Sequence, residues 1–359
     1  MRRGAAPRRA AAVVLTILAA GAALAAEPGF RPIGIEARPI RHFLIGSDET
    51  RFGWLRFRGG LELSSADPDF GALSGLDFAA DGITLYAVTD TGFWFTARLV
   101  EDDGAPTGLD RPAMAPMLDV GGAPLAGKVN ADAEGLRLVA GADGRRALVS
   151  FERRARVHAY AGAPDFAPAP ARELRLPGFV DGVRANQGLE AIAAARGDGP
   201  LAGAIVVIAE RSLDKRGNHR AFVLDGPRAG AFSISRFGGY DITDAAFMPD
   251  GDLLILERRF GMREGIGMRM RRLSEERIRP GAALDGPVLI EADNRFQIDN
   301  MEGLAVRAGP NGETLVAMVS DDNHSLLQRT LLLEFVLGGA VPPMPRLRPQ
   351  AAAMPRPSP

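Results

Sequence analysis

Five segments of the chain follow one plan, and their starting points are 54 to 60 residues apart. Each segment reads as a short apolar strand, a tight turn, a β-branched strand that ends in an acid, and a third strand. The five segments start at Ser74, Glu134, Glu190, Asp244 and Glu302. Asp81-Gly82, Asp143-Gly144, Asp250-Gly251 and Asn311-Gly312 fall at the first turn of four segments. Such pairs tolerate the positive φ of two-residue hairpins, so the pattern predicts repeated antiparallel units.

A fourth strand candidate lies between successive segments. These candidates are centred near Met117, Leu174, Ile234 and Leu289. Four antiparallel strands per unit match the size and order of a β-propeller blade. The fifth segment has no fourth strand after it, but an unpaired strand candidate that starts at Trp54 precedes the first segment. We therefore expect an all-β fold, a single β-propeller of five four-stranded blades, whose ring is closed by this N-terminal strand.

Two other architectures remain open at this point. Six blades would result if residues 43–54, or the long third segment, contain a further blade. A pair of β-sandwiches with accidental internal similarity would also give many short strands. In every case helix content is expected to be very low, and residues 43–337 are expected to form one propeller domain, because no linker interrupts them.

Both ends of the chain differ from the repeated middle. Residues 1–26 contain four arginines, an uncharged Ala-rich run and Ala23-Leu24-Ala25, the pattern of a cleaved signal peptide. This pattern predicts a periplasmic or secreted protein with no stable membrane anchor after cleavage, and leaves the general and twin-arginine export routes open. Residues 338–359 are rich in Pro and Ala and predict a disordered tail.

Composition excludes several classes of function. The chain has no cysteine, which excludes disulfide scaffolds, Cys-ligated zinc, iron–sulfur clusters and thiol catalysis. With 43 Lys+Arg against 44 Asp+Glu there is no general basic field, so no nucleic-acid partner is expected. No G-x-S-x-G, P-loop or dinucleotide-binding motif occurs, and the four histidines lack zinc-like spacing.

Aligning the five segments reveals two acidic columns. The first contains Ser74, Glu134, Glu190, Asp244 and Glu302, and the second contains Asp90, Glu152, Glu210, Glu257 and Asp321. In a propeller both columns would lie toward one mouth of the axial channel. Nine carboxylates on one face repel one another unless positive charge lies among them.

Two sources of positive charge fit these columns. A hard cation such as Ca²⁺ binds several carboxylate and carbonyl oxygens without Cys or His. Alternatively, arginine directly follows the second acid at Arg153, Arg211 and Arg258, so structural Glu–Arg pairs between blades are an open reading of the second column. For the first column, its place at the channel mouth favours contact with metal or substrate. Arg211 and Lys215 belong to a polar turn that could bind phosphate or simply be solvated.

Several sequence runs resemble a known family. They are SGLDFAADGITLYAVTDTG, DAEGL, SFERR, NQGLE, AERS, DITDAAF, DGDLLILERRF and NMEGLAV. Over residues 60–337 the chain is similar to the phytase-like β-propeller domain of "esterase-like activity of phytase" proteins. The resemblance implies an exported bacterial propeller related in architecture to calcium-dependent phytases, which hydrolyse phosphomonoesters at the channel mouth with Ca²⁺ between carboxylates and phosphate. By motif position it assigns metal binding to both columns of acids.

Three functional hypotheses follow. The first is a Ca²⁺-dependent phosphoesterase in which Glu190 and Glu302 are catalytic carboxylates and Arg211, Lys215 or Arg258 stabilise developing charge. The second is a metal-assisted hydrolase of carboxylic esters or lactones. The third is a periplasmic binding or scaffold propeller without catalysis, whose acids form Glu–Arg pairs. The expected partner is a small phosphorylated or ester substrate, and the oligomeric state is not predicted.

Overall fold

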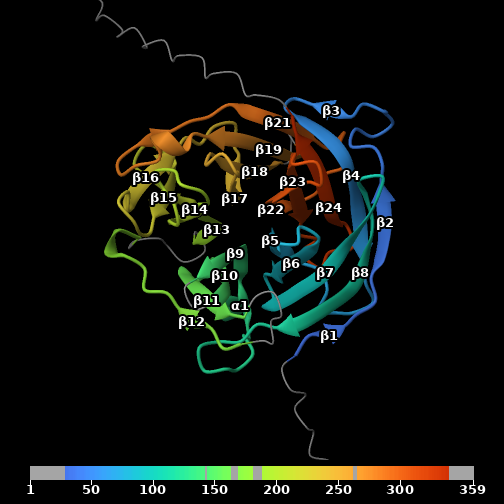
Figure 1. The fold of residues 1–359 in the computed structure, drawn as a ribbon, viewed down its shortest axis with the longest axis horizontal. Coiled ribbons are helices and arrows are strands. Elements are labelled where there is room, and N and C mark those ends of the chain that lie inside the picture. The colour runs from blue at the N-terminus through green and yellow to red at the C-terminus, as the bar shows by residue number, and fades with distance from the viewer. Residues whose placement is uncertain (1–28, 142–143, 163–168, 181–187, 262–264, 339–359) are drawn as a thin grey trace, which may run out of the picture.

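The structure, a computed structural model, describes residues 29–141, 144–162, 169–180, 188–261 and 265–338. Five sheets, antiparallel except for one parallel pair of strands, surround one axis (Figure 1). The strands nearest to the axis are β5 (Leu73–Phe78), β9 (Ala133–Gly141), β13 (Leu189–Ala194), β17 (Asp241–Phe247) and β22 (Met301–Ala308). The predicted all-β propeller with five blades is thus confirmed. The predicted signal peptide, nearly all of the predicted tail and Asp143 of one predicted turn lie outside the described residues.

The blades are numbered in chain order, and each is given from its inner strand outward. Blade 1 contains β5 (Leu73–Phe78), β6 (Thr84–Thr89), β7 (Phe93–Asp102), β8 (Ala105–Pro116) and β1 (Arg31–Pro32). Blade 2 contains β9 (Ala133–Gly141), β10 (Gly144–Phe151), β11 (Arg156–Ala161) and β12 (Arg172–Glu173). Blade 3 contains β13 (Leu189–Ala194), β14 (Ile205–Leu213), β15 (His219–Val223), β16 (Gly230–Ile234) and β20 (Ala283–Leu284).

Blade 4 contains β17 (Asp241–Phe247), β18 (Leu253–Gly261), β19 (Gly265–Leu273) and β21 (Val288–Asp293). Blade 5 contains β22 (Met301–Ala308), β23 (Thr314–Ser320), β24 (Thr330–Leu337), β4 (Leu55–Ser64) and β2 (Glu36–Ile40), with β3 (Arg51–Phe52) paired to β4. The described helices are α1 (Lys128–Ala131) and the 3₁₀ turns η1 (Gly178–Val180) and η2 (Glu275–Arg277). No helix among the described residues is long and apolar enough to cross a membrane.

The ring is closed between the two ends of the domain, as predicted. Strand β4, near the N-terminus, pairs antiparallel with the last strand, β24, from Leu55 opposite Leu337 to Leu63 opposite Thr330. This pairing satisfies the backbone groups that an edge strand would leave open. Because β4 and β24 share one sheet, blade 5 contains strands from both ends of the domain.

The hydrophobic core is divided among the spaces between neighbouring blades. One cluster, for example, joins Leu76 and Phe95 of blade 1 to Ala305 and Val319 of blade 5. Four similar clusters fill the other spaces. Where a blade is covered on both faces, a strand such as β14 or β23 is apolar on both faces rather than alternating.

The inner strands approach one another closely because small residues line their contacts. A Cβ atom on Gly75 would lie 2.5 Å from the carbonyl oxygen of Glu134, and one on Gly135 would lie 2.9 Å from that of Glu190. Both glycines follow directly after a first-column position. This tight ring brings the first-column side chains of different blades into one small space.

Candidate functional site

Every inner strand carries a β-bulge near its first residues. An extra residue lies at Ser74 in β5, at Glu134–Gly135 in β9, at Glu190 in β13, at Thr243 in β17 and at Glu302 in β22. Bulges redirect side chains and are common near functional sites. In blade 4 the bulge lies at Thr243, so Thr243 and not Asp244 occupies the first-column position. The sequence alignment of blade 4 was therefore wrong by one residue.

Asp244 lies deeper, as part of a buried ion pair. Its Oδ1 accepts a hydrogen bond from Arg137 Nη2 at 2.9 Å, and its Oδ2 accepts one from the backbone N–H of Leu304 at 2.8 Å. Arg137 Nη1 donates to the carbonyl of Leu76 at 3.0 Å. Burial raises the pKa of Asp244 to about 7 although Arg137 opposes this. The pair connects the inner strands of blades 1, 2, 4 and 5 and is structural rather than part of the channel mouth.

The second column is also displaced by one residue in blade 4. The backbone N–H groups of Asp90, Glu152, Glu210 and Asp321 donate to the carbonyls of Ala72, Asp132, Gly188 and Asn300, respectively. In blade 4 Asp241 takes the place of these four acceptor residues, and the residue paired with it is Arg258, not Glu257. Blade 4 therefore contributes an arginine where the other four blades contribute an acid.

Glu257 is fully buried away from the channel mouth. Its carboxylate accepts hydrogen bonds from Arg269 Nε at 2.7 Å and from Arg271 Nε at 2.8 Å. Both arginines lie on the neighbouring strand β19. The predicted metal-binding role for Glu257 is therefore replaced by a structural one.

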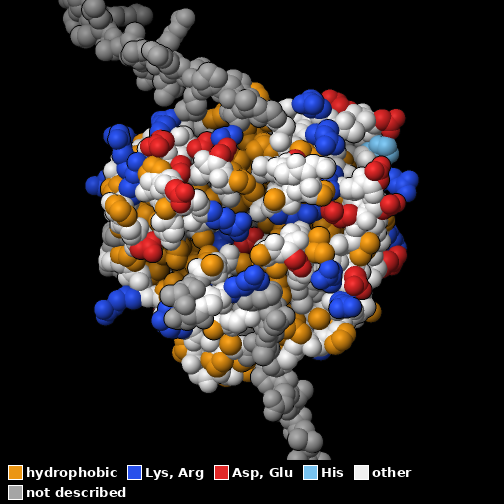
Figure 2. All heavy atoms as spheres, viewed as in Figure 1, with side chains coloured by type: hydrophobic (Ala, Val, Ile, Leu, Met, Phe, Trp, Pro, Cys, Tyr) orange, Lys and Arg blue, Asp and Glu red, His pale blue; other side chains and the backbone are white. Residues whose placement is uncertain are grey.

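The remaining column acids line one cavity of about 1110 Å³. It is lined by Asp90, Glu134, Glu152, Glu190, Glu210, Glu302 and Asp321 of the two columns, and by Arg211 and Arg258. Lys215, a predicted catalytic residue, is exposed in the turn between Asp214 and Asn218 and is not part of the lining. Figure 2 shows acidic and basic side chains gathered at the centre of one face of the ring, among exposed hydrophobic ones.

One part of the cavity wall is neutralised by ion pairs. Arg258 Nε lies 3.0 Å from Glu302 Oε1, and its Nη2 lies 3.6 Å from Glu210 Oε1. Arg211 and Arg236 pair with Asp241 at 3.4 and 2.6 Å. Arg258 thus links acids of blades 3 and 5, which is the inter-blade Glu–Arg contact considered from the sequence.

A second ion-paired group lies on the opposite side of the ring. Lys128, at the start of α1, contacts Asp132 Oδ1 at 2.6 Å and also pairs with Asp90. Arg153 Nε donates to Asp132 Oδ2 at 3.0 Å. Asp90 and Asp132 therefore have cationic partners from the chain itself.

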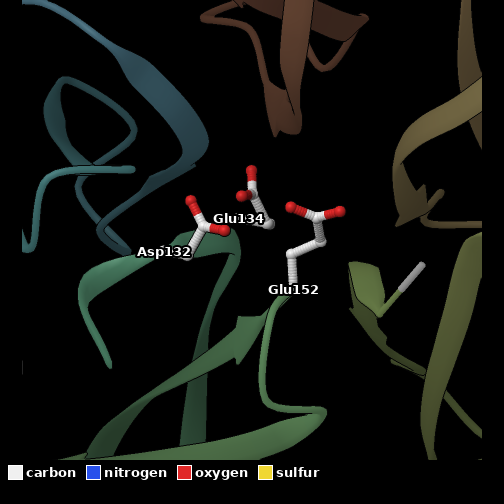
Figure 3. A group of neighbouring side chains, drawn as sticks. All are labelled: Asp132, Glu134 and Glu152. Atoms are coloured by element: carbon white, nitrogen blue, oxygen red, sulfur yellow. The ribbon is translucent and has the colours of Figure 1, made fainter. Parts of the chain in front are cut away.

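The acids between these two groups lack such partners. None of the ion pairs among the described residues involves Glu134, Glu152, Glu190 or Asp321. Ligand oxygens of Asp132, Glu134 and Glu152 lie within 4.8 Å of one another, as do those of Glu152, Glu190 and Glu210. Figure 3 shows the first three carboxylates directed into the same space inside the ring. We call Glu134, Glu152, Glu190 and Glu210 the carboxylate cluster.

Burial and mutual repulsion raise the pKa of these acids. Burial is the main cause for Glu134 and Glu190, whose pKa values lie well above the ordinary value because neighbouring carboxylates add to it. The pKa of Glu152 rises to about 7 through burial and the hydrogen bond with Asp132. That of Asp321 rises to about 8 through burial and the charge of Glu302. The cluster is therefore a place where added positive charge would be stabilised.

Sequence reasoning missed several residues of the cavity. Asp132, Asp241 and Asn300 each precede a first-column residue by two positions, in the runs DAE, DIT and NME. Lys128, Arg236 and Asp299 also line the cavity. The spacing of two residues was a usable signal, because the same offset recurs in three of the five repeats. Lys128 and Arg236 lie outside the inner strands, where the repeat alignment gives no guidance.

A family model described as "Phytase-like: Esterase-like activity of phytase" matches residues 68–324, more than half of the chain. The chain belongs to the phytase-like family. The site described above thus lies within the phytase-like domain, because most of the lining residues fall inside the matched range. A search of curated proteins finds no match.

Solved structures similar to this phytase-like protein are distant in sequence. A chain of Polycomb Repressive Complex 2 from Chaetomium thermophilum has 13% identity and a TM-score of 0.34, over 76% of this chain and 56% of that one. A gluconolactonase from Xanthomonas campestris has 13% identity and a TM-score of 0.40, over 85% and 99%. The Dos1 propeller has 10% identity and a TM-score of 0.35, over 80% and 75%. The phytase-like chain therefore spans about half the length of the first of these.

Proposed function

We propose that this phytase-like protein is an exported, metal-assisted hydrolase of phosphomonoesters or related esters, acting in the acidic cavity. The observation that carries the proposal is the carboxylate cluster, whose members Glu134, Glu152 and Glu190 form no ion pair among the described residues although arginines lie nearby. Such an arrangement is suited to a cation bound by the carboxylate cluster, with an anionic substrate between that cation and the arginines. Export is supported by the signal-like pattern of residues 1–26.

The residues of the cluster fit a calcium ion. Ca²⁺ prefers several carboxylate oxygens and needs no Cys or His. Oε1 of Glu210 is buried and accepts no hydrogen bond from any described residue, with Arg258 Nη2 3.6 Å away. Asp132 and the four members of the carboxylate cluster would hold the ion. When bound, it would supply Lewis acidity toward a substrate oxygen and lower the pKa of a water molecule.

The chain itself would orient the substrate and manage charge. Arg211, Arg236 and Arg258 line the cavity, and a guanidinium fork matches the oxygens of a phosphate. Arg258, held between Glu210 and Glu302, would stabilise negative charge that develops on the substrate. Burial raises the pKa of Glu302 to about 7 against the opposing charge of Arg258, so this carboxyl can accept or donate a proton near neutral pH.

Hydrolysis assays test this proposal. Purified protein with Ca²⁺ should hydrolyse p-nitrophenyl phosphate, phytate or p-nitrophenyl acetate, and Glu190→Gln should lower kcat/KM on the preferred substrate about 100-fold or more. Glu49→Gln, an exposed residue outside the cavity lining, serves as the matched control and should leave the rate unchanged. Equal rates for Glu190→Gln and wild type would contradict the assignment of the site.

The effect of calcium should depend on pH. Because the pKa values of Glu152, Glu302 and Asp321 are raised to about 7, 7 and 8, the cation-free folded state keeps protons between pH 5 and 8 that the unfolded chain has lost. The contribution of these three carboxyl groups to the stability of the cation-free protein therefore falls as pH rises. Calcium that binds at low pH must also displace the protons that these groups hold. The increase in Tm caused by calcium, measured by calorimetry, should be larger at pH 8 than at pH 5.5. An equal increase at both values would argue against binding at these carboxyls.

A second candidate is a non-catalytic binding propeller. The contacts of Arg258 with Glu210 and Glu302 favour it, since they show that part of the acidic ring is used in structural pairs. In that case none of the three substrates would be hydrolysed, and Glu190→Gln would affect stability and ligand binding alone.

A further inference from the structure

We propose that the mouth of the acidic cavity selects phosphomonoesters of apolar alcohols, with one anionic group and an adjacent aryl or alkyl group. This inference rests on the proposed function and concerns which substrate that site accepts. The observation is an apolar rim, which we define as Phe260, Ile266 and Leu327, all of which line the cavity. Phe260 is 79% exposed and Leu327 is 94% exposed.

Two of the three rim residues, Phe260 and Leu327, are not explained by the packing of the fold. Phe260, near the end of β18, pairs across the strand with Ile266 of β19, which packs against the core between blades 4 and 5. The Phe260 ring itself stays in solvent, and Leu327 lies in the loop between β23 and β24. Large apolar side chains gathered at the mouth of a polar cavity are typical of a ligand contact.

The strand that carries Phe260 also sets its distance from the anion-binding arginine. Phe260 follows Arg258 by two positions in β18, so both side chains leave the same face of the strand, about 7 Å apart along it. Both line the cavity. When the anionic group of a ligand contacts Arg258, the ligand atoms about 7 Å from that group would therefore contact Phe260.

The charge of the lining argues against polyanionic ligands. Ten carboxylates line the cavity together with four Lys and Arg side chains. The four cations are already paired with acids of the lining. Each additional phosphate on a substrate would have to be neutralised by additional bound cations, because like charges at these distances repel. A substrate with a single phosphate and an apolar remainder matches the cavity better than a polyphosphorylated polyol.

A substrate series tests the rim. With calcium present, kcat/KM should rise about 10-fold or more from methyl phosphate to hexyl phosphate and phenyl phosphate, and inositol hexakisphosphate should be the poorest substrate. Phe260→Ser and Leu327→Ser should each remove most of this rise. Leu326→Ser is the matched control, because Leu326 is fully exposed beside Leu327 but does not line the cavity, and it should keep the rise.

A binding measurement separates this inference from the proposed hydrolysis. Phenylphosphonate should bind the calcium-loaded wild type about 10-fold more tightly than methylphosphonate in isothermal titration, and this preference should be lost in Phe260→Ser. If no ester is hydrolysed but the preference is found, the proposed hydrolysis fails and the specificity of the rim stands. Equal affinity for both phosphonates would overturn the inference. So would a wild-type dimer in sedimentation experiments that Phe260→Ser dissociates, since a second copy would then cover the rim.

Discussion

Replacing Asp244 with Ala should lower the free energy of unfolding by about 3–5 kcal/mol, because it leaves the charge of Arg137 buried without its partner. Both side chains of this pair are nearly inaccessible, at 0% and 4% exposure. The substitution also removes the acceptor of the Leu304 N–H and disconnects inner strands of separate blades. Urea denaturation followed by circular dichroism at pH 7 measures the loss.

Two comparisons keep this prediction specific. Asp48→Ala removes an exposed carboxylate and should change stability by about 0–1 kcal/mol. The double variant Arg137→Met with Asp244→Leu should recover part of the loss, because the buried charges are then both absent. A loss below about 1 kcal/mol in Asp244→Ala would contradict the role of the pair in holding the ring.

Replacing Arg258 with Gln should destabilise the protein by about 3 kcal/mol when divalent cations are removed with EDTA. The reason is that Glu302 and the carboxylate cluster, which includes Glu210, lose a partly buried positive charge. Added calcium should reduce this loss, because a bound cation can compensate part of the repulsion. Denaturation curves in EDTA and in calcium measure both quantities.

Arg211→Gln is the matched control for this prediction. Arg211 also contacts Glu210, but its side chain is 57% exposed, so its loss should cost about 0–1 kcal/mol. If the two variants lost equal stability, or if calcium left the Arg258→Gln loss unchanged, the account of Arg258 as the internal counter-charge of the ring would be wrong.

Much of the fold could be predicted because the repeated hairpin signals are local. The closing strand could be predicted from the number of strand candidates in each repeat. One candidate was missing after the fifth repeat, and one unpaired candidate preceded the first. The outer strand of blade 1 was placed near Met117, whereas β8 spans Ala105–Pro116. Asp103 and Gly104 link β7 to β8 with φ values of 47° and 74°, which is the geometry of a tight Asp-Gly hairpin. This turn signal was present in the sequence, but it did not fall at the first turn of a repeat.

The errors in the site come from blade 4, where the acids are displaced by one residue. Matching by acid type placed Asp244 and Glu257 in the columns, whereas the bulge in β17 places Thr243 and Arg258 there. Because side chains alternate across a strand, a slip of one residue exchanges a channel position for a buried one. The partner that holds Asp244 is Arg137, 107 residues away, and no local pattern predicts that contact. The column acids of blades 1, 2, 3 and 5 do line the cavity, because their bulges lie at the positions that the repeat alignment matched.

We infer that the carboxylate cluster binds a divalent cation, and calcium titration into EDTA-treated, dialysed protein tests this binding most directly. Glu152 is the best residue to replace, because its oxygens belong to both groups of closely spaced acids. Isothermal titration should detect calcium binding to the wild type and to the Glu49→Gln control, with affinity at least about 10-fold weaker in Glu152→Gln. Absence of calcium binding in the wild type, or equal affinity in Glu152→Gln, would contradict the claim.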